Sequence, residues 1–142
     1  MRVVIDASVV VKWIFPERDA EPHSDRALEL LGDIQAGRVE VVQPVHWLAE
    51  VAAVTARLAP DFSREAIGLL CAMELATHDE PETYFRACDL AADLEHHVFD
   101  TLYHAVALSL ADGRLVTADE RYWRKARHVG RVERLRDYRI TA

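Results

Sequence analysis

Short apolar runs alternate along the chain with longer segments in which apolar residues recur at helical spacing. The runs are continuous and rich in β-branched residues, which is typical of strands buried on both faces of a parallel sheet. Asp6 closes the first run and Pro44 follows the second. The predicted strands are Arg2–Ile5, Val39–Val42, Arg114–Thr117 and a weak final one, Val132–Leu135.

The segments between these runs predict helices. Ser24 and Ser63 are expected to cap two of them, and Pro81 suits the first turn of a third. The helix after Ser24 would carry its apolar face on Ala27, Leu28, Leu31 and Ile34 and end at Gly37. The other expected helical segments are Val9–Phe15, Val45–Ala59, the residues from Ser63 to about Leu75 and from Pro81 to about Glu95, Thr101–Ala111 and Glu120–Arg127.

Strands that alternate with helices predict an α/β/α sandwich around a central, mostly parallel sheet. A length of 142 residues fits a single domain over residues 1–142. In such sheets the functional crevice lies at the carboxyl ends of the strands. The residues that follow each strand are therefore the first place to look for a site.

Composition narrows the class of protein without naming it. Hydrophobic residues make up 51% and charged residues 29%, which is ordinary for a globular domain. No apolar stretch reaches about 18 residues and the N-terminus has no signal-peptide pattern, so we expect a cytoplasmic protein without membrane contact. Cys71 and Cys88 have neither disulfide nor zinc spacing, and buried thiols are the expectation for both.

The charge is unevenly distributed. The net charge of −7 is the sum of −12 over residues 1–113 and +5 over residues 114–142. A basic end on an acidic body is expected where one face meets phosphate or an acidic partner, although it can also solvate a terminal helix. Candidate phosphate-binding cations follow Asp119 within two helical turns: Arg121, Arg124, Lys125 and Arg127.

Four acidic residues stand where the predicted fold would bring them together: Asp6, Glu50, Asp100 and Asp119. Asp6 and Asp119 follow strands, Asp100 opens a helix, and Glu50 lies on the flank of a helical apolar stripe. Each Asp could instead cap a helix, and Glu50 alone is more often a solvated residue. Taken together, crowded carboxylates need a cation, and oxygen ligands select magnesium or manganese.

Four segments around these carboxylates resemble the motifs of PIN-domain ribonucleases, in the order and spacing of that family. They are Val3–Ser8, Trp47–Val51, Phe99–Tyr103 and Leu115–Asp119, and Phe99 stands where many members carry Tyr. Among PIN proteins, a chain of this size is most similar to the VapC toxins of toxin–antitoxin pairs.

The resemblance implies a PIN-like sandwich and a metal-dependent endoribonuclease that cuts tRNA or rRNA, leaving 5′-phosphate and 3′-hydroxyl ends. Asp6, Asp100 and Asp119 would hold Mg²⁺, or Mn²⁺ as a substitute, and Glu50 would bind a second ion or orient the attacking water. Ser8 and Thr117 could hold carboxylates in place.

The same resemblance implies a homodimer that is neutralised by a VapB-type antitoxin. The apolar segment Val9–Phe15 is the expected source of a dimer surface. A PIN nuclease that processes RNA without being a toxin is the nearest alternative. A metal-dependent phosphatase would want Asp where Ser8 stands, and a non-catalytic RNA-binding module would not need all four acids. The pairs His46–Glu50 and Asp100–His104 at i,i+4 leave a transition-metal site open.

Overall fold

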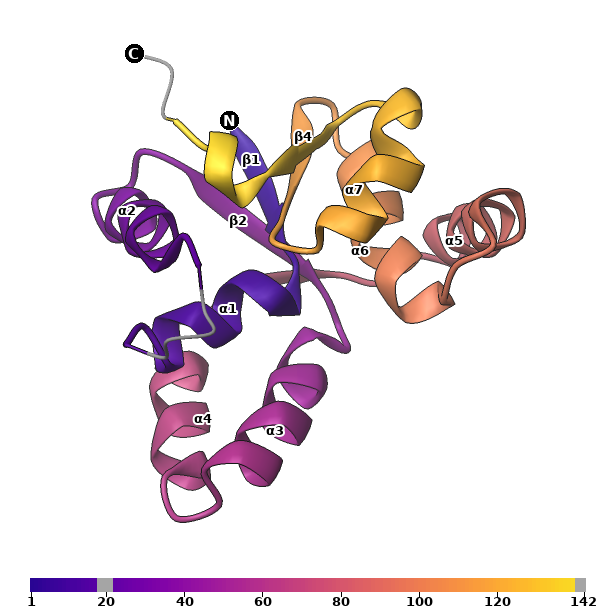
Figure 1. Cartoon of the computed structure of the whole chain (residues 1–142). Coiled ribbons are helices and arrows are strands. Elements are labelled where there is room, and N and C mark those ends of the chain that lie inside the picture. The colour runs from indigo at the N-terminus through magenta and orange to yellow at the C-terminus, as the bar shows by residue number, and fades with distance from the viewer. Residues whose placement is uncertain (18–21, 140–142) are drawn as a thin grey trace.

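Five parallel strands form the centre of the fold in the computed structural model, which describes residues 1–17 and 22–139 (Figure 1). Within that part of the chain the strand order is β3-β2-β1-β4-β5, and every neighbouring pair is parallel. The strands are β1 Arg2–Ile5, β2 Glu40–Pro44, β3 Ala76–His78, β4 Gly113–Thr117 and β5 Val132–Arg134. The predicted α/β sandwich is thus confirmed, with a sheet that is parallel throughout.

Helices flank the sheet. The central one, α6, packs against β1, β2 and β4, which explains why its residues from Thr101 to Ala107 are all buried. The helices α3 and α4 contact each other and lie below the sheet in the view of Figure 1, while α5 packs against α6. Their bounds are α1 Ala7–Ile14, α2 Ser24–Gln35, α3 Trp47–Leu58, α4 Ser63–Ala72, α5 Pro81–Leu94, α6 Val98–Ser109 and α7 Glu120–Ala126, with 3₁₀ turns at Arg127–Val129 and Leu135–Asp137.

The carboxyl ends of β1 and β4 lie side by side in the middle of the sheet. Ile5 is in register with Val116, and the backbone N–H of Asp6 donates to the carbonyl of Val116 over 3.0 Å. Because both strands point the same way, the residues that follow them leave the sheet at one edge. That edge is where Asp6 and Asp119 lie.

A buried side chain replaces backbone pairing where β1 and β2 end. The register between these strands runs through Val3 and Val41, and beyond it the fully buried Gln43 bridges to Ile5. Its amide oxygen accepts from the Ile5 N–H at 2.7 Å, and its amide nitrogen donates to the Ile5 carbonyl at 2.9 Å. Gln43 therefore satisfies both backbone groups of the last residue before Asp6.

Several local predictions were wrong. The strand β3 was not predicted, and neither Ser24 nor Ser63 caps its helix: His23 precedes α2 with φ of 65°, and the Ser63 hydroxyl donates to the Pro60 carbonyl. In α2 the buried leucine is Leu30, whereas Leu28 is exposed.

The apolar segment expected to form a dimer surface lies largely in the core. Val9, Val10 and Val11 of α1 are buried within the chain, so they cannot supply such a surface. In the described residues no helix is long and apolar enough to span a bilayer. Both cysteines are exposed rather than buried.

Candidate acidic metal site

Asp6 caps α1, and Ser8 fixes its carboxylate. The Ser8 backbone N–H donates to Oδ2 of Asp6 at 3.1 Å, and the Ser8 hydroxyl donates to the same oxygen. That hydroxyl also accepts from the Ala118 N–H at 3.1 Å. Ser8 therefore joins the ends of β1 and β4 while it holds the first carboxylate in one orientation.

The surroundings of the Asp6 carboxyl disfavour its charged form. Burial raises its pKa from 3.8 to about 7, the Ser8 hydrogen bonds oppose the rise, and the charges of Asp100 and Glu50 add to it. A carboxyl that holds a proton near neutrality beside other carboxylates is stabilised in its charged form by a cation. This electrostatic deficit is the property expected of a metal site.

Asp119 and Asp100 face each other from two different helices. Asp119 caps α7, where its Oδ1 accepts from the Tyr122 N–H at 3.0 Å. Asp100 lies in the first turn of α6 and caps nothing, because His97 is the residue before that helix. Ligand atoms of Asp100, Asp119 and His96 all lie within 4.8 Å of one another. Capping therefore accounts for Asp6 and Asp119 but not for Asp100.

The two hydroxyl residues predicted to hold carboxylates act differently. Ser8 donates directly to the Asp6 carboxylate, as described above. Thr117 is buried, and its hydroxyl oxygen accepts from the Asp119 backbone N–H at 3.0 Å. Thr117 therefore positions the main chain of Asp119, and Tyr122 rather than Thr117 binds its carboxylate.

Glu50 reaches the cluster from α3 and is held by two side chains. The Tyr103 hydroxyl donates to Oε1 of Glu50 at 2.7 Å, and Nε2 of His46 lies 3.2 Å from the same oxygen. Burial raises the pKa of Tyr103, and the charges of Asp6, Glu50 and Asp100 raise it further, so its hydroxyl keeps its proton and stays a donor. Tyr103 lies one turn after Asp100, and that i,i+3 spacing was the available sign that it faces the site.

His46 lies on this side of the cluster, where its surroundings favour the protonated ring. Its Nε2 donates to the Phe99 carbonyl at 2.7 Å as well as facing Glu50, and its Nδ1 is buried without a partner in the described residues. Burial alone lowers the pKa of His46, but the Glu50 hydrogen bond, the Phe99 carbonyl and the charges of Glu50 and Asp6 together raise it.

His96, in the connection between α5 and α6, faces the cluster. Its Nε2 lies 2.7 Å from Oδ2 of Asp100, and Nζ of Lys125 lies 3.3 Å from its Nδ1. A lysine ammonium can only donate, so Nδ1 accepts and Nε2 carries the hydrogen that Asp100 receives. In this arrangement His96 is a hydrogen-bond donor to a carboxylate and has no lone pair to offer a metal.

The second i,i+4 pair considered for a transition metal is not a metal site. His104 is buried, its Nε2 donates to the Gly130 carbonyl at 2.8 Å, and its Nδ1 accepts from the Tyr122 hydroxyl at 2.8 Å. Burial lowers the pKa of His104, which suits a neutral ring. The available ligands around the cluster are thus carboxylate oxygens, the set that magnesium and manganese prefer.

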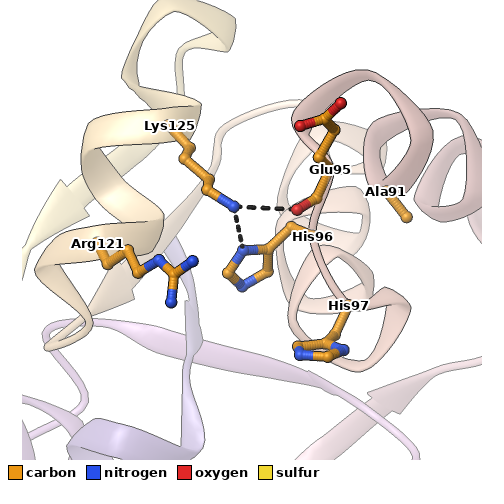
Figure 2. A pocket seen from close by; sticks show the side chains of 6 residues that line it. All are labelled: Ala91, Glu95, His96, His97, Arg121 and Lys125. Carbon is orange, nitrogen blue, oxygen red and sulfur yellow. Dashed lines mark hydrogen bonds between the residues drawn. The ribbon is translucent and has the colours of Figure 1, made fainter.

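The four basic residues of α7 and its end divide into two pairs. Arg121 and Lys125 lie one turn apart and line a pocket beside His96 (Figure 2). Arg124 instead lies 3.9 Å from Glu120, and the Arg127 guanidinium lies over the Trp123 ring at 5.1 Å from its centroid. In the described contacts only the first pair lies beside His96, the residue that contacts Asp100.

Comparison with known proteins identifies the family. The model of the PIN domain matches residues 3–128. A chain in the crystal structure of VapBC2 from Rickettsia felis, bound to a DNA fragment from their promoter, superposes with a TM-score of 0.68 at 18% identity, over 94% of this chain and 98% of that one. No curated protein sequence matches significantly. Because the family model spans most of its length, this chain belongs to the PIN domain family, whose members are in general nucleases that use a divalent metal.

Proposed function

We propose that this protein is a magnesium-dependent endoribonuclease of the VapC type, which cuts tRNA or rRNA in the cytoplasm and so inhibits translation. The observation that carries the proposal is the grouping of Asp6, Glu50, Asp100 and Asp119 around one edge of the sheet, with the Asp6 pKa raised to about 7. Like-charged groups so placed cost stability unless they bind a cation. That cost is explained if the cluster serves metal-assisted hydrolysis of phosphodiester bonds.

Asp6, Asp100 and Asp119 would hold Mg²⁺ directly or through water, with Mn²⁺ as a substitute, and Glu50 would bind a second ion or orient water. When bound, the metal supplies charge neutralisation at the scissile phosphate and lowers the pKa of a bound water. The oxygen donors fit it, and the hydrogen that His96 donates to Asp100 argues against a nitrogen ligand and hence against zinc.

Protein side chains would do the positioning. Ser8 fixes the Asp6 carboxylate, His96 fixes that of Asp100, and Tyr103 and His46 both bind Oε1 of Glu50. The second oxygen of Glu50 then remains to accept a hydrogen bond from the attacking water. Attack at phosphorus with departure of the ribose O3′ leaves a 5′-phosphate and a 3′-hydroxyl.

Arg121 and Lys125 would hold RNA phosphates near the cut, whereas Arg124 and Arg127 contact Glu120 and Trp123 instead. A chain of net charge −7 repels a polyanion at long range, so it needs a local positive surface. Arg121 and Lys125 are the best placed of the four, because they line the pocket beside His96.

A VapB-type antitoxin and a second copy of the chain are the proposed protein partners. The antitoxin is suggested by the structural neighbour, which is a VapBC2 complex. For the homodimer, the candidate surface is the exposed apolar pair Phe62 and Leu69, which line one pocket with Trp13 and Ile14 from the end of α1.

Sequencing of RNA ends after brief expression in cells tests the function, with Asp6→Asn as the inactive control. We expect new 5′-phosphate ends at a small set of tRNA or rRNA positions and growth arrest with the wild type alone. Purified protein should cut the same positions only when Mg²⁺ or Mn²⁺ is added. Identical RNA ends in wild type and variant would refute the nuclease assignment, and cutting without growth arrest would favour a processing nuclease over a toxin.

A further inference from the structure

A pocket of about 400 Å³ lies beside the carboxylates, between the end of α5 and α7 (Figure 2). We propose that it binds the RNA phosphate that neighbours the scissile one, so that the strand is held at two consecutive phosphates. This inference rests on the proposed function, since it assigns a second contact to the same substrate. The pocket is lined by Ala91, Glu95, His96, His97, Arg121 and Lys125.

The Arg121 guanidinium has no partner within the described part of the chain. Within the described residues its side chain makes no hydrogen bond, ion pair or ring contact, and in Figure 2 it points across the pocket toward His96. Arginine offers a planar pair of donors that matches two phosphate oxygens. An unpaired guanidinium in this pocket therefore favours phosphate as its ligand.

Lys125 is already partly bound and plays a supporting role. Its ammonium donates to the Glu95 carbonyl at 3.0 Å and to Nδ1 of His96, which leaves one of its three hydrogens for a ligand. The Glu95 carboxylate, the only acidic group of the lining, is directed away from Arg121 and Lys125 in Figure 2. The polar groups that face the open space are thus cationic or hydrogen-bond donors.

His96 forms the wall that the pocket shares with the metal site. One edge of its ring meets Asp100 at 2.7 Å, and the other meets Lys125. A phosphate in the pocket would therefore lie one imidazole ring away from the carboxylates. A single RNA strand that crosses this ring would present one phosphate on each side of it.

The proposal assigns the phosphate to one pair of basic residues and not to the other pair. Arg121 and Lys125 face the pocket, whereas Arg124 lies on another face of α7 near Glu120. A general electrostatic attraction would use all of these cations about equally. A built phosphate site requires that Arg121 matter and Arg124 not.

The test compares Arg121→Ala with Arg124→Ala, which removes the same charge from the same helix. RNA oligonucleotides that span the mapped cut carry either normal linkages or one uncharged methylphosphonate on either side of it. Binding is measured by fluorescence anisotropy without added metal over a range of salt concentrations, and kcat/KM is measured with Mg²⁺. Thermal melting checks that each variant is folded.

We expect Arg121→Ala to weaken RNA binding about tenfold and to reduce the slope of log K against log salt by about 0.7, the value for one phosphate of a single strand. A methylphosphonate at one of the two neighbouring linkages should weaken binding to the wild type and to Arg124→Ala, but not to Arg121→Ala. Such a non-additive cycle assigns that phosphate to Arg121.

Equal losses in the two variants, or a methylphosphonate penalty that persists in Arg121→Ala, would overturn the pocket as a phosphate site. Unchanged RNA binding with loss of antitoxin binding would overturn it in favour of an acidic protein segment. These failures leave cleavage by the wild type intact. Failure of the wild type to bind or cut any RNA would instead refute the proposed function.

Discussion

The two sides of the carboxylate cluster use the same spacing to opposite effect. On the α3 side His46 precedes Glu50 by four residues, and on the α6 side His96 precedes Asp100 by four. The third partner differs: the Phe99 carbonyl accepts a hydrogen from His46, whereas the Lys125 ammonium donates one to His96. Burial lowers the pKa of His46, but the hydrogen bonds with Glu50 and then with Phe99 raise it above its usual value. The hydrogen bond from Lys125 leaves His96 to donate through Nε2 to Asp100. The same i,i+4 spacing therefore serves different roles once the third partner is added.

The largest expected loss of activity comes from replacing a carboxylate of the cluster. Asp6→Asn or Asp100→Asn should lower kcat/KM for RNA by at least about a thousandfold, because each removes a proposed metal ligand, and the metal would supply several kcal/mol of transition-state stabilisation. Asn at position 6 can still accept the two Ser8 hydrogen bonds, so folding should survive. Asp89→Asn, an exposed acid of α5, is the matched control and should keep full activity. Activity that survives in both site variants would reduce these residues to helix caps and surface charges.

A smaller loss of activity is expected from replacing Phe99, an aromatic residue in the first turn of α6. Phe99 is 61% exposed directly before Asp100, while its carbonyl is held by His46. An exposed ring there can stack on a nucleobase beside the cut, a contact of roughly 1–3 kcal/mol. Phe99→Ala should therefore raise KM about tenfold on normal RNA, and raise it little on RNA with an abasic residue next to the cut.

Phe85 provides a control for this experiment, since it is 60% exposed on α5. Phe85→Ala should leave KM unchanged on both RNAs. If Phe85→Ala behaves like Phe99→Ala, or if the abasic RNA suffers the same loss, the ring does not stack on a base.

Replacing Lys125 should remove the difference in hydrogen bonding that distinguishes His96 from His46. Lys125→Met removes the donor that keeps the hydrogen on Nε2 of His96, so the ring becomes free to ligate a metal together with Asp100 and Asp119. Affinity for Co²⁺ or Zn²⁺ should rise about tenfold relative to Mg²⁺, the lower end of what outer-sphere changes achieve. Visible absorption of the Co²⁺ form would report the nitrogen ligand. Arg124→Met, which removes a charge without touching His96, should leave the metal preference as it is.

The smallest effect is a pH dependence of stability in the metal-free protein. A carboxyl whose pKa is raised by folding, here Asp6 from 3.8 to about 7, is more protonated in the folded chain, so its penalty is absent near pH 4 and grows until about pH 7. The full shift corresponds to about 4 kcal/mol, and partial exposure of Asp6 reduces our expectation to about 1 kcal/mol. Asp6→Asn should thus raise the melting temperature by about 4 °C at pH 8 and by nothing at pH 4, with EDTA present. An equal gain at both pH values would mean that relief of charge is not the cause.

The sequence predicted the parts of the fold that are encoded locally. Each of the buried strands β1, β2 and β4 is marked in the sequence by a run of apolar residues. The position of the candidate site follows, because Asp6 and Asp119 leave the same edge of a parallel sheet. The strand β3 has no such run: Ala76 is exposed, and the segment is a strand only because it pairs with Val42 of β2. That pairing is a tertiary fact which periodicity does not record.

The grouping of the four carboxylates was predicted from their positions in the sequence, whereas the directions of the neighbouring side chains were not. Glu50 was found because a helical wheel places it on the flank of α3. The direction of His96 was not predicted, because it depends on Glu95, which ends α5 with a φ of 51°. The separation of Arg121 and Lys125 from Arg124 likewise required knowledge of which face of α7 the α5 end covers.

The amide of Gln43 makes a side chain behave as part of the main chain. Only a group that presents one donor and one acceptor in the same plane can replace it, since Ile5 offers one of each. Leucine would leave two unpaired backbone groups in the core, and glutamate would set an acceptor against the Ile5 carbonyl. In a scan of all substitutions, position 43 should therefore tolerate almost no other residue, although it touches no proposed ligand. A relative with another residue at position 43 should bond the end of β1 differently, and this would change the main chain that carries the first carboxylate.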